Sequence, residues 1–260
     1  MEEFTGLRVL VTGSTRGLGK ASAMLFLERG ASVVFHGRSQ SAVDAILSGL
    51  VDDHRGRAEG YGADLQSRSE ADRLAADVGA VDVVVNCAGV YEEAAIDIAD
   101  ERHWDRLFET NLTAPWRLSR AMVPGLRDRR GTIVNVASDA ALLGYARASA
   151  YCASKGALVG LTRALATELA PHVRAVSVCP GPIDTDMMRQ LPGGPDDAAA
   201  QWEAYTLLGR VSTPEEIAPA VVFAASPMCT YQTGSIVLVD GGATAGRRMT
   251  AVDERDLSVG

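Results

Sequence analysis

The stretch RVLVTGSTRGLG, residues 8–19, decides the fold. RVLVT at 8–12 reads as a buried strand, and it runs directly into a turn with glycines at 13, 17 and 19. A helix that begins at such a turn points its free N–H groups at a ligand, which suits a pyrophosphate. The spacing is G-x-x-x-G-x-G rather than the commoner G-x-G-x-x-G. We therefore predict a nucleotide site here.

Short runs rich in β-branched residues recur along the chain and alternate with helical stretches. Several runs are apolar on both faces, as in a parallel sheet covered by helices on both sides. The alternation predicts an α/β protein with a doubly wound parallel sheet of about seven strands. The further expected strands are 32–36, 58–65 (weaker), 81–86, 131–138, 173–180 and 234–240, and the expected helices are 17–29, 40–51, 67–78, 101–128, 150–170 and 214–225.

Composition and charge exclude several classes of function. The net charge is 25 − 33 = −8, which argues against nucleic acid or an anionic membrane as the main partner. The acidic start leads straight into a strand, so we expect no signal peptide, and no apolar run approaches membrane-spanning length. The four cysteines are scattered, which indicates free thiols, a reducing cytoplasmic compartment and no metal site. We expect one domain over 1–246 and a polar tail over 247–260.

The end of the second strand bears on which nucleotide binds. An acid often stands there in NAD-binding folds and accepts hydrogen bonds from the ribose hydroxyls. This chain has Gly37 followed by Arg38, and Arg16 lies inside the glycine turn. Two guanidinium groups can hold a 2′-phosphate as bidentate donors. The pattern favours NADP(H) over NAD(H).

YCASK, residues 151–155, places a tyrosine and a lysine four apart, so on a helix both lie on one face. Lowering a phenol pKa from about 10 by about three units takes roughly 4 kcal/mol. A cation at about 4 Å supplies about 1 kcal/mol in water but about 4 kcal/mol at an effective dielectric of about 20. The pair can therefore act as an acid–base catalyst only where water is excluded. Lys155 is one of two lysines among 25 basic residues.

The glycine turn and the YCASK pair belong to a set of six motifs that occur in order along the chain. They are TGSTRGLG (12–19), NCAG (86–89), Asn111 in TNLTAPW, Ser138 in IVNVAS, YCASK (151–155) and PGPIDTDM (180–187). Together they resemble the short-chain dehydrogenase/reductase family, over essentially the whole chain to about residue 244. The resemblance implies a single-domain Rossmann-type fold and assembly as a homotetramer or homodimer. One departure is Cys87, where the family often has a second asparagine.

The resemblance also implies roles for individual residues. Tyr151 would be the general acid/base, Lys155 would lower its pKa and bond the nicotinamide ribose, and Ser138 would polarise the substrate carbonyl. Asn111 would bend its helix locally and anchor a water that links Lys155 to solvent. The residues expected to bind the cofactor are Gly13, Ser14, Thr15, Arg16, Gly17, Leu18, Gly19, Gly37, Arg38, Ser39, Asp64, Leu65, Asn86, Ala88, Gly89, Tyr151, Lys155, Pro180, Gly181, Ile183 and Thr185.

The substrate end is less well marked. The long irregular stretch at about 184–213 is a candidate lid. Its Trp202 and Tyr205 either close over an apolar substrate or form the packed face of a short helix. The candidate substrate residues are Ser138, Tyr145, Met187, Met188, Trp202 and Tyr205. A basic cluster at Arg127, Arg129 and Arg130 either docks an acidic acyl carrier or is a solvated helix end.

The leading hypothesis is an NADP(H)-dependent oxidoreductase that acts on a small-molecule carbonyl or alcohol. A 3-oxoacyl-thioester reductase and a ketoreductase of secondary metabolism are its two branches. The alternatives are an NAD-linked dehydrogenase of sugars or polyols, which Gly37 opposes, and a non-enzymatic NADP-sensing protein. A sensor would be expected to have lost Tyr151 or Lys155, and both are present.

Overall fold

The computed structural model describes residues 3–189 and 202–246. Its centre is a seven-stranded sheet in the order β3-β2-β1-β4-β5-β6-β7, and every pair of neighbouring strands is parallel. The predicted α/β class is therefore confirmed. The strands are β1 (Arg8–Val11), β2 (Ser32–Gly37), β3 (Ala58–Gly62), β4 (Val83–Asn86), β5 (Thr132–Val136), β6 (Arg174–Pro180) and β7 (Ile236–Val239).

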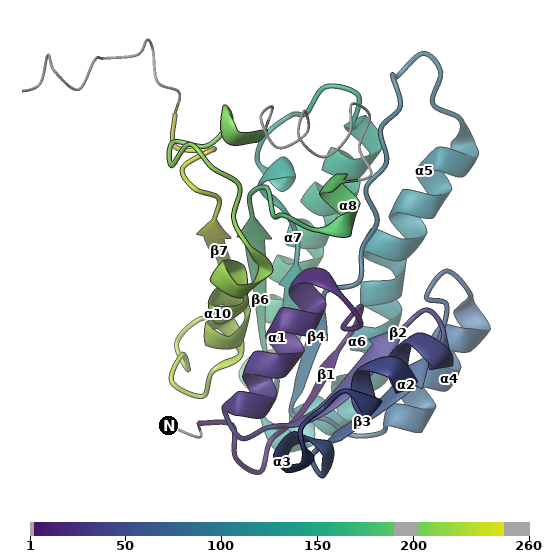
Figure 1. Ribbon diagram of the computed structural model, residues 1–260, viewed down its shortest axis with the longest axis vertical. Helices are drawn as coiled ribbons and strands as arrows, with labels where there is room; N and C mark the ends of the chain where they lie inside the picture. The colour runs from purple at the N-terminus through teal and green to yellow at the C-terminus, as the bar shows by residue number, and fades with distance from the viewer. Residues whose placement is uncertain (1–2, 190–201, 247–260) are drawn as a thin grey trace, which may run out of the picture.

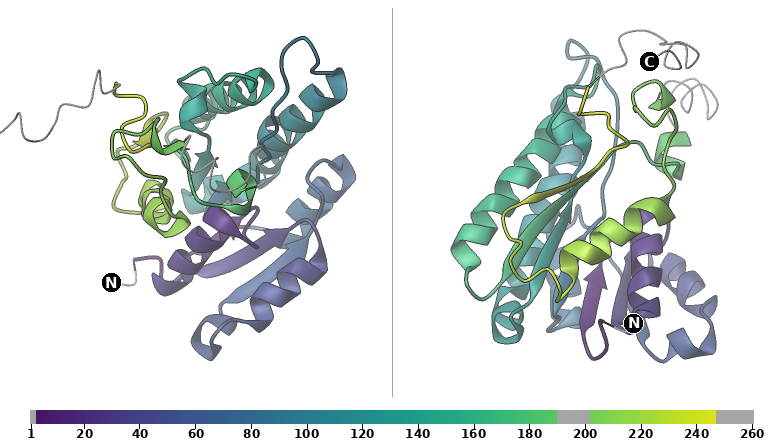
Figure 2. Two further views of the ribbon diagram at one scale, coloured as in Figure 1. Left: turned by 45° about the horizontal axis from the view of Figure 1, so that its top comes forward. Right: turned by 90° about the vertical axis from the view of Figure 1, so that its left-hand side faces the viewer.

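Helices cover both faces of the sheet (Figures 1 and 2). Helices α1 and α10 pack against each other on one face, with α2 beside the β2–β3 edge, while α4, α6 and α7 lie on the other. The helices are α1 (Gly17–Glu28), α2 (Gln40–Ser48), α3 (Asp52–Arg55), α4 (Arg68–Val78), α5 (Glu101–Phe108), α6 (Ala114–Arg129), α7 (Ser149–Leu169), α8 (Asp186–Arg189) and α10 (Pro214–Ala225). Among the described residues, no helix combines the length and apolar character needed to cross a membrane.

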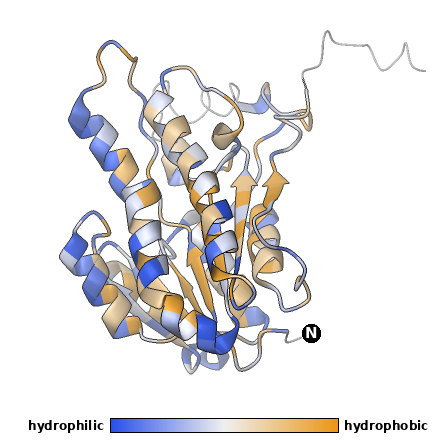
Figure 3. Ribbon diagram, turned by 180° about the vertical axis from the view of Figure 1, so that it is seen from behind, coloured by the Kyte–Doolittle hydropathy of each residue, from blue (hydrophilic) through white to orange (hydrophobic). Residues whose placement is uncertain are grey.

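Two apolar cores lie on opposite faces of the sheet. Side chains alternate along a strand, so Val9 and Val11 of β1 pack in the core that contains Phe26 of α1. Leu10 points the other way and packs in the core that contains Leu118 of α6. The strands are accordingly apolar nearly throughout, while the helices are apolar along one stripe (Figure 3). Each fully buried side chain of this size contributes about 1.5–3 kcal/mol.

The strand order also locates the ligand crevice. From β1 the chain builds outward through β2 to β3, and β4 then returns to the other side of β1. The loops that follow β1 and β4 therefore diverge at the carboxyl ends of neighbouring strands. Open α/β sheets bind their ligands in the crevice at such a reversal.

Some expected boundaries differ from the structure. The single helix expected over 101–128 is divided by a π-helical turn, η1 (Glu109–Thr113), because buried side chains there bond to neighbouring segments instead of facing solvent. The weak strand over 58–65 ends at Gly62. Part of the candidate lid, 190–201, and the tail, 247–260, lie outside the described residues.

Candidate active site

The glycine turn joins β1 to α1 and is fastened to β4. The Thr12 hydroxyl accepts hydrogen bonds from the backbone N–H groups of Cys87 (2.9 Å) and Ala88 (3.0 Å). Helix α1 begins after Arg16 with no side-chain cap and no acid in its first turn. Helices α3, α6 and α7 also lack a capping side chain, but the first residues of α1, Gly17, Leu18 and Gly19, themselves line the cavity, so the free N–H groups there are open to a ligand.

His36, at the end of β2, holds this turn in place and was not predicted. Its Nδ1 accepts from the backbone N–H of Gly13 (3.1 Å), and its Nε2 lies 3.0 Å from the carbonyl oxygen of Ala63. These partners require a neutral ring with its proton on Nε2. Burial agrees, because it lowers the pKa of His36 to about 4. The only sequence signal was a histidine directly before Gly37.

The groups expected around the nucleotide base and ribose gather at one end of the cavity. Gly37, Arg38, Asp64 and Leu65 all line it. Ser39 lines it too, although its hydroxyl accepts from the backbone N–H of Ala42 (3.3 Å) and so caps α2. The ends of β2 and β3 therefore bring separate predicted motifs to one wall.

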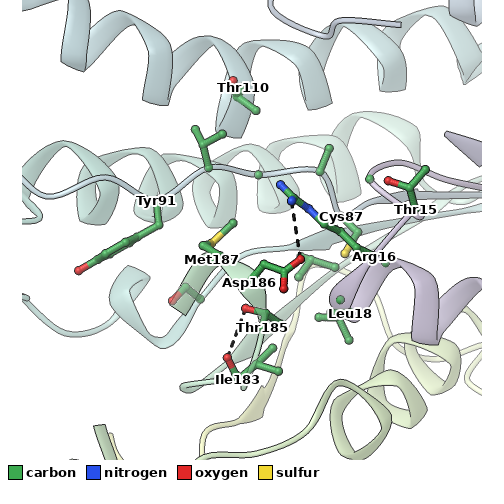
Figure 4. A pocket seen from close by; sticks show the side chains of 18 of the residues that line it. Thr15, Arg16, Leu18, Cys87, Tyr91, Thr110, Ile183, Thr185, Asp186 and Met187 are labelled. Carbon is green, nitrogen blue, oxygen red and sulfur yellow. Dashed lines mark hydrogen bonds and ion pairs between the residues drawn. The ribbon is translucent and has the colours of Figure 1, made fainter. Parts of the chain in front are cut away.

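Arg16 reaches across the mouth of the cavity. Its Nη1 lies 3.7 Å from Oδ2 of Asp186, the first residue of α8 (Figure 4). Both side chains are more than half exposed, so solvent screens the pair and it contributes little stability. A phosphate could therefore displace Asp186 from Arg16 at small cost.

Three polar groups meet at the other end of the same cavity. Ser138 follows β5, and Tyr151 and Lys155 lie one turn apart on α7. The ring of Tyr151 packs edge-on against Tyr91 with centroids 4.7 Å apart. Lys155 Nζ donates to the carbonyl oxygen of Val136 (3.0 Å) and lies 5.8 Å from the centroid of the Tyr151 ring. A reacting carbonyl placed here would meet both hydroxyls.

The electrostatics of the pair differ from the simple expectation. Burial raises the pKa of Tyr151, and a hydrogen bond with Ser138 opposes that shift. Burial also lowers the pKa of Lys155 to about 8. The ammonium bonds a carbonyl instead of the phenol oxygen, so desolvation outweighs its attraction for phenolate. Lys155 by itself therefore does not lower the pKa of Tyr151 toward neutral pH.

Asn111 lies in the π-helical turn, where the resemblance places a local bend, but outside the cavity lining. Its Oδ1 accepts from the backbone N–H of Val90 (2.9 Å), and its Nδ2 donates to the Val90 carbonyl (2.9 Å) and to Ser154 Oγ (3.1 Å). Asn111 therefore ties the loop after β4 to α7 one residue before Lys155.

Two further candidates face away from the cavity. The Ser14 hydroxyl is fully buried and accepts from the backbone N–H of His36 (2.9 Å). The Asn86 amide donates to Asn135 Oδ1 (2.8 Å) and Ser119 Oγ (3.1 Å) behind the sheet edge. Their side chains shape the wall from behind, and no pattern in the sequence indicated which way they point.

Aromatic side chains close the substrate end. Tyr145, Trp202, Met187 and Met188 line the cavity, whereas Tyr205 does not. The ring of Tyr145 lies 5.1 Å from that of Trp202 and 6.3 Å from that of Tyr205, centroid to centroid. Tyr205 thus supports the lining rings from outside.

The whole cavity has a volume of about 750 Å³ and runs without a break from the glycine turn to Trp202. Pockets for small ligands and cofactors are about 300–1,000 Å³. Several further residues also line the cavity although no sequence motif indicated a role for them; these include His36, Tyr91, Thr110, Val136 and Asp139.

The chain is similar to characterised families and proteins over most of its length. A family model described as enoyl-(acyl carrier protein) reductase matches residues 13–244. The 3-oxoacyl-[acyl-carrier-protein] reductase FabG of Vibrio cholerae is 37% identical over 239 residues, which cover 91% of this chain and 97% of that protein. The 2-(S)-hydroxypropyl-CoM dehydrogenase 3 of Xanthobacter autotrophicus is 35% identical, covering 91% of this chain and 96% of that one.

A solved structure agrees with these matches. It is described as a short chain dehydrogenase/reductase family protein and is 38% identical, with a TM-score of 0.85 over 94% of this chain and 100% of that one. The resemblance drawn from the six motifs is thereby confirmed. The chain belongs to the short-chain dehydrogenase/reductase family and is an oxidoreductase of the kind that acts on carbonyl and alcohol groups.

Proposed function

We propose that the protein is an NADP(H)-dependent reductase that interconverts a carbonyl and a secondary alcohol, with Tyr151 as its general acid/base. One observation carries the proposal. A single cavity joins the open start of α1 and the arginines Arg16 and Arg38 to the Ser138, Tyr151 and Lys155 groups. Hydride transfer to a carbonyl needs a dinucleotide and a proton donor side by side.

The cavity fits such a cofactor. The uncapped N-terminus of α1 suits the pyrophosphate, and Asp64 and Leu65 line the adenine end. The backbone around Ala88, Gly89 and Ile183 lines the middle toward the nicotinamide end. When bound, the cofactor would supply the hydride and, in its oxidised form, a positive ring that favours phenolate at Tyr151.

The protein's own groups would handle the proton. Tyr151 would donate to the carbonyl oxygen during reduction, and Ser138 would stabilise the developing alkoxide as a second donor. Lys155 would supply positive charge and a donor for the nicotinamide ribose. Because its pKa is about 8, Lys155 could take up or release a proton near neutral pH.

Support for NADP(H) comes from charge at the adenosine end. Arg38 is exposed beside the cavity, and among the described residues the Arg16 side chain makes one weak ion pair, with Asp186. Gly37 has no room for the acid typical of NAD-binding chains, since a Cβ there would lie 2.5 Å from Cγ2 of Thr15. The position of the Thr15 side chain is therefore a further argument against an NAD-linked dehydrogenase of sugars or polyols.

Substrate class is supported by the relatives and by the lid. The relatives include reductases of 3-oxoacyl chains, and the aromatic and thioether lining of Tyr145, Trp202, Met187 and Met188 suits an apolar chain. A 3-oxoacyl thioester or a ketone of secondary metabolism is therefore our proposed substrate. The sensor alternative has no such support, because all the proposed proton-handling groups are present.

The test is loss of NADPH absorbance with a panel of 3-oxoacyl thioesters and cyclic ketones. We expect turnover in the wild type and a fall of at least about a hundredfold in Tyr151→Phe, which keeps the ring but removes the proton. Tyr231→Phe, fully exposed and outside the cavity, is the matched control. Turnover that survives in Tyr151→Phe would remove the phenol from the mechanism, and tight NADPH binding without turnover would favour the sensor.

The cofactor preference needs separate variants. Arg16→Ala and Arg38→Ala should each weaken NADPH binding roughly tenfold or more while NADH binding changes little, because each loses a charge-assisted hydrogen bond to phosphate. Gly37→Asp should move the preference toward NADH, and it requires Thr15→Ser in the same chain to clear Cγ2. An NADPH to NADH ratio unchanged by all of these would refute the assignment of the 2′-phosphate.

A further inference from the structure

The segment 90–94, which follows β4, packs against the start of α7, and the proposed mechanism does not use it. Its Tyr91 lines the cavity on the side away from Arg16 (Figure 4). The Tyr91 ring meets the ring of Tyr151 at an interplanar angle of 80°, with centroids 4.7 Å apart. Ring pairs in this edge-to-face arrangement are attractive and directional at about 4.5–7 Å. Tyr91 therefore contacts the proposed general acid directly.

The Tyr91 ring is itself held in place. Its hydroxyl donates to Glu93 Oε1 (2.8 Å). Glu93 Oε2 lies 3.5 Å from Nε of Arg147, and the backbone N–H of Ala94 donates to the Arg147 carbonyl oxygen (2.8 Å). The Glu93 side chain is 21% exposed and that of Arg147 is 57% exposed, so solvent screens the ion pair more than the bond from the phenol. The phenol–carboxylate bond and the backbone bond are therefore the main restraints.

Arg147 lies just before α7 and has an unfavourable backbone conformation. Its φ of 61° is in the left-handed region, which residues with a side chain rarely adopt. Such a conformation persists where neighbouring contacts fix it. Helix α7 begins at Ser149, and no side chain of the described residues caps it. The bonds from Ala94 and Glu93 to Arg147 therefore fix the entry to the helix that carries Tyr151.

The other side of the segment 90–94 is anchored as well. Asn111 bonds both the N–H and the carbonyl oxygen of Val90 (2.9 Å each). Glu92 Oε1 accepts from Nε of Arg106 in α5 (3.2 Å). The residues on either side of Glu92 contact α7 or the residues just before it, so the segment braces the start of α7 against α5 and the π-helical turn.

We propose that Tyr91 is a positioning residue for the general acid and that Glu93 holds it for that task. Tyr151 lies in the first turn of α7, where the Tyr91 ring limits how far the phenol can tilt. Proton transfer is sensitive to such a displacement, since about 1 Å of misplacement can cost about a hundredfold in rate. Tyr91 acts through Tyr151, so this inference rests on the proposed function.

The test measures kcat, the KM of a ketone that the wild type reduces, and the Kd of NADPH. Tyr91→Leu removes the ring and should lower kcat at least about tenfold, while the Kd of NADPH stays within about twofold. Tyr91→Phe keeps the ring but frees it from Glu93, and it should lower kcat about threefold. Glu93→Leu should match Tyr91→Phe. Glu93→Gln, which keeps an acceptor oxygen, should remain close to wild type.

Two comparisons separate positioning from general damage. The double variant Tyr91→Phe/Glu93→Leu should be no slower than the slower single variant, because both changes break the same hydrogen bond. Tyr61→Phe is the matched control and should leave kcat unchanged. The Tyr61 hydroxyl also bonds a glutamate two positions away, Glu59 (3.2 Å), but in β3 and apart from the described residues that line the cavity. Thermal melting and the stoichiometry of NADPH binding show whether each variant is folded.

The outcomes distinguish this inference from the reductase proposal. If turnover depends on Tyr151 but Tyr91→Leu keeps the wild-type kcat, the positioning role is overturned and the reductase stands. An NADPH affinity that falls as much as kcat would also overturn the role, because it would indicate general damage. Turnover that survives in Tyr151→Phe would refute the proposed function itself.

If no ketone turns over, amide hydrogen exchange replaces the kinetics. The backbone N–H of Cys152 donates to the Ala148 carbonyl oxygen (2.8 Å) and so reports on the first turn of α7. Exchange of this amide that is at least about threefold faster in Tyr91→Leu than in wild type would support the restraint of Tyr151. Equal exchange in the two proteins would overturn it.

Discussion

Replacing Lys155 by methionine should stabilise the fold while removing activity. Burial lowers the pKa of Lys155 from 10.5 to about 8, a difference of about 2.5 units, or about 3 kcal/mol at pH 7, where the ammonium is charged in both states. Methionine fills a similar volume without the charge. Loss of the hydrogen bond to Val136 offsets about 1 kcal/mol, so the net gain should be about 2 kcal/mol.

The pH dependence has a definite sign. A folded-state pKa below the unfolded one means that the folded protein binds fewer protons, so the cost of Lys155 is full below about pH 8 and declines as pH rises toward about 10.5. The advantage of Lys155→Met should therefore shrink by roughly half or more between about pH 7 and about pH 9.5.

Urea unfolding of wild type and Lys155→Met at both pH values measures this, with NADPH oxidation as the activity assay. Lys20→Met is the matched control, because Lys20 is the other lysine of the chain and is exposed. It should change stability by less than about 0.5 kcal/mol. A Lys155→Met protein that is less stable than wild type at pH 7 would show that the buried ammonium is well paired, and would refute the expected cost of burying it.

The remaining predictions concern the glycine turn. Gly19→Ala would place a Cβ 2.3 Å from the Gly13 carbonyl oxygen, so the turn must open, and NADPH affinity measured by calorimetry should fall at least about a hundredfold. The control is Gly160→Ala in α7, where the added Cβ meets open space, and this change should stabilise the protein by about 1 kcal/mol. Unchanged NADPH binding in Gly19→Ala would contradict the close packing of the turn. The pKa of His36 is about 4 in the folded protein and 6.5 in the unfolded chain, so protonation should reduce the free energy of unfolding by up to about 3 kcal/mol as pH falls from about 6.5 to about 4. His36→Gln should lack this loss of stability. Identical unfolding free energies for the two proteins across this pH range would show that His36 is not held neutral.

The fold could be predicted because its determinants are local in the chain. Apolar runs such as RVLVT alternate with amphipathic stretches, and that alternation admits few arrangements other than a covered parallel sheet. The Tyr151 and Lys155 pairing followed from helical spacing alone. The family followed from motif order, which the relatives and the solved structure confirm.

The site was predictable only where a motif carried its residues. His36 and Tyr91 are single residues near strand ends, and nothing nearby in the sequence distinguishes them from surface positions. Their importance comes from contacts with Gly13 and Tyr151 that the parallel sheet creates. Helical periodicity predicted one unbroken helix over 101–128, and a bend at Asn111 was expected only from the family resemblance, since it depends on the contacts of Asn111 with Val90 and Ser154.

The sequence by itself therefore determined the architecture, the family and which residue types are available for chemistry. Tertiary structure alone decided which of those residues share a cavity and how each one ionises. Periodicity and helical spacing act between residues a few positions apart, so they can be read along the chain. Burial, which raises the pKa of Tyr151 and lowers that of Lys155, depends on atoms brought together from distant segments, and it appears only once the sheet has assembled.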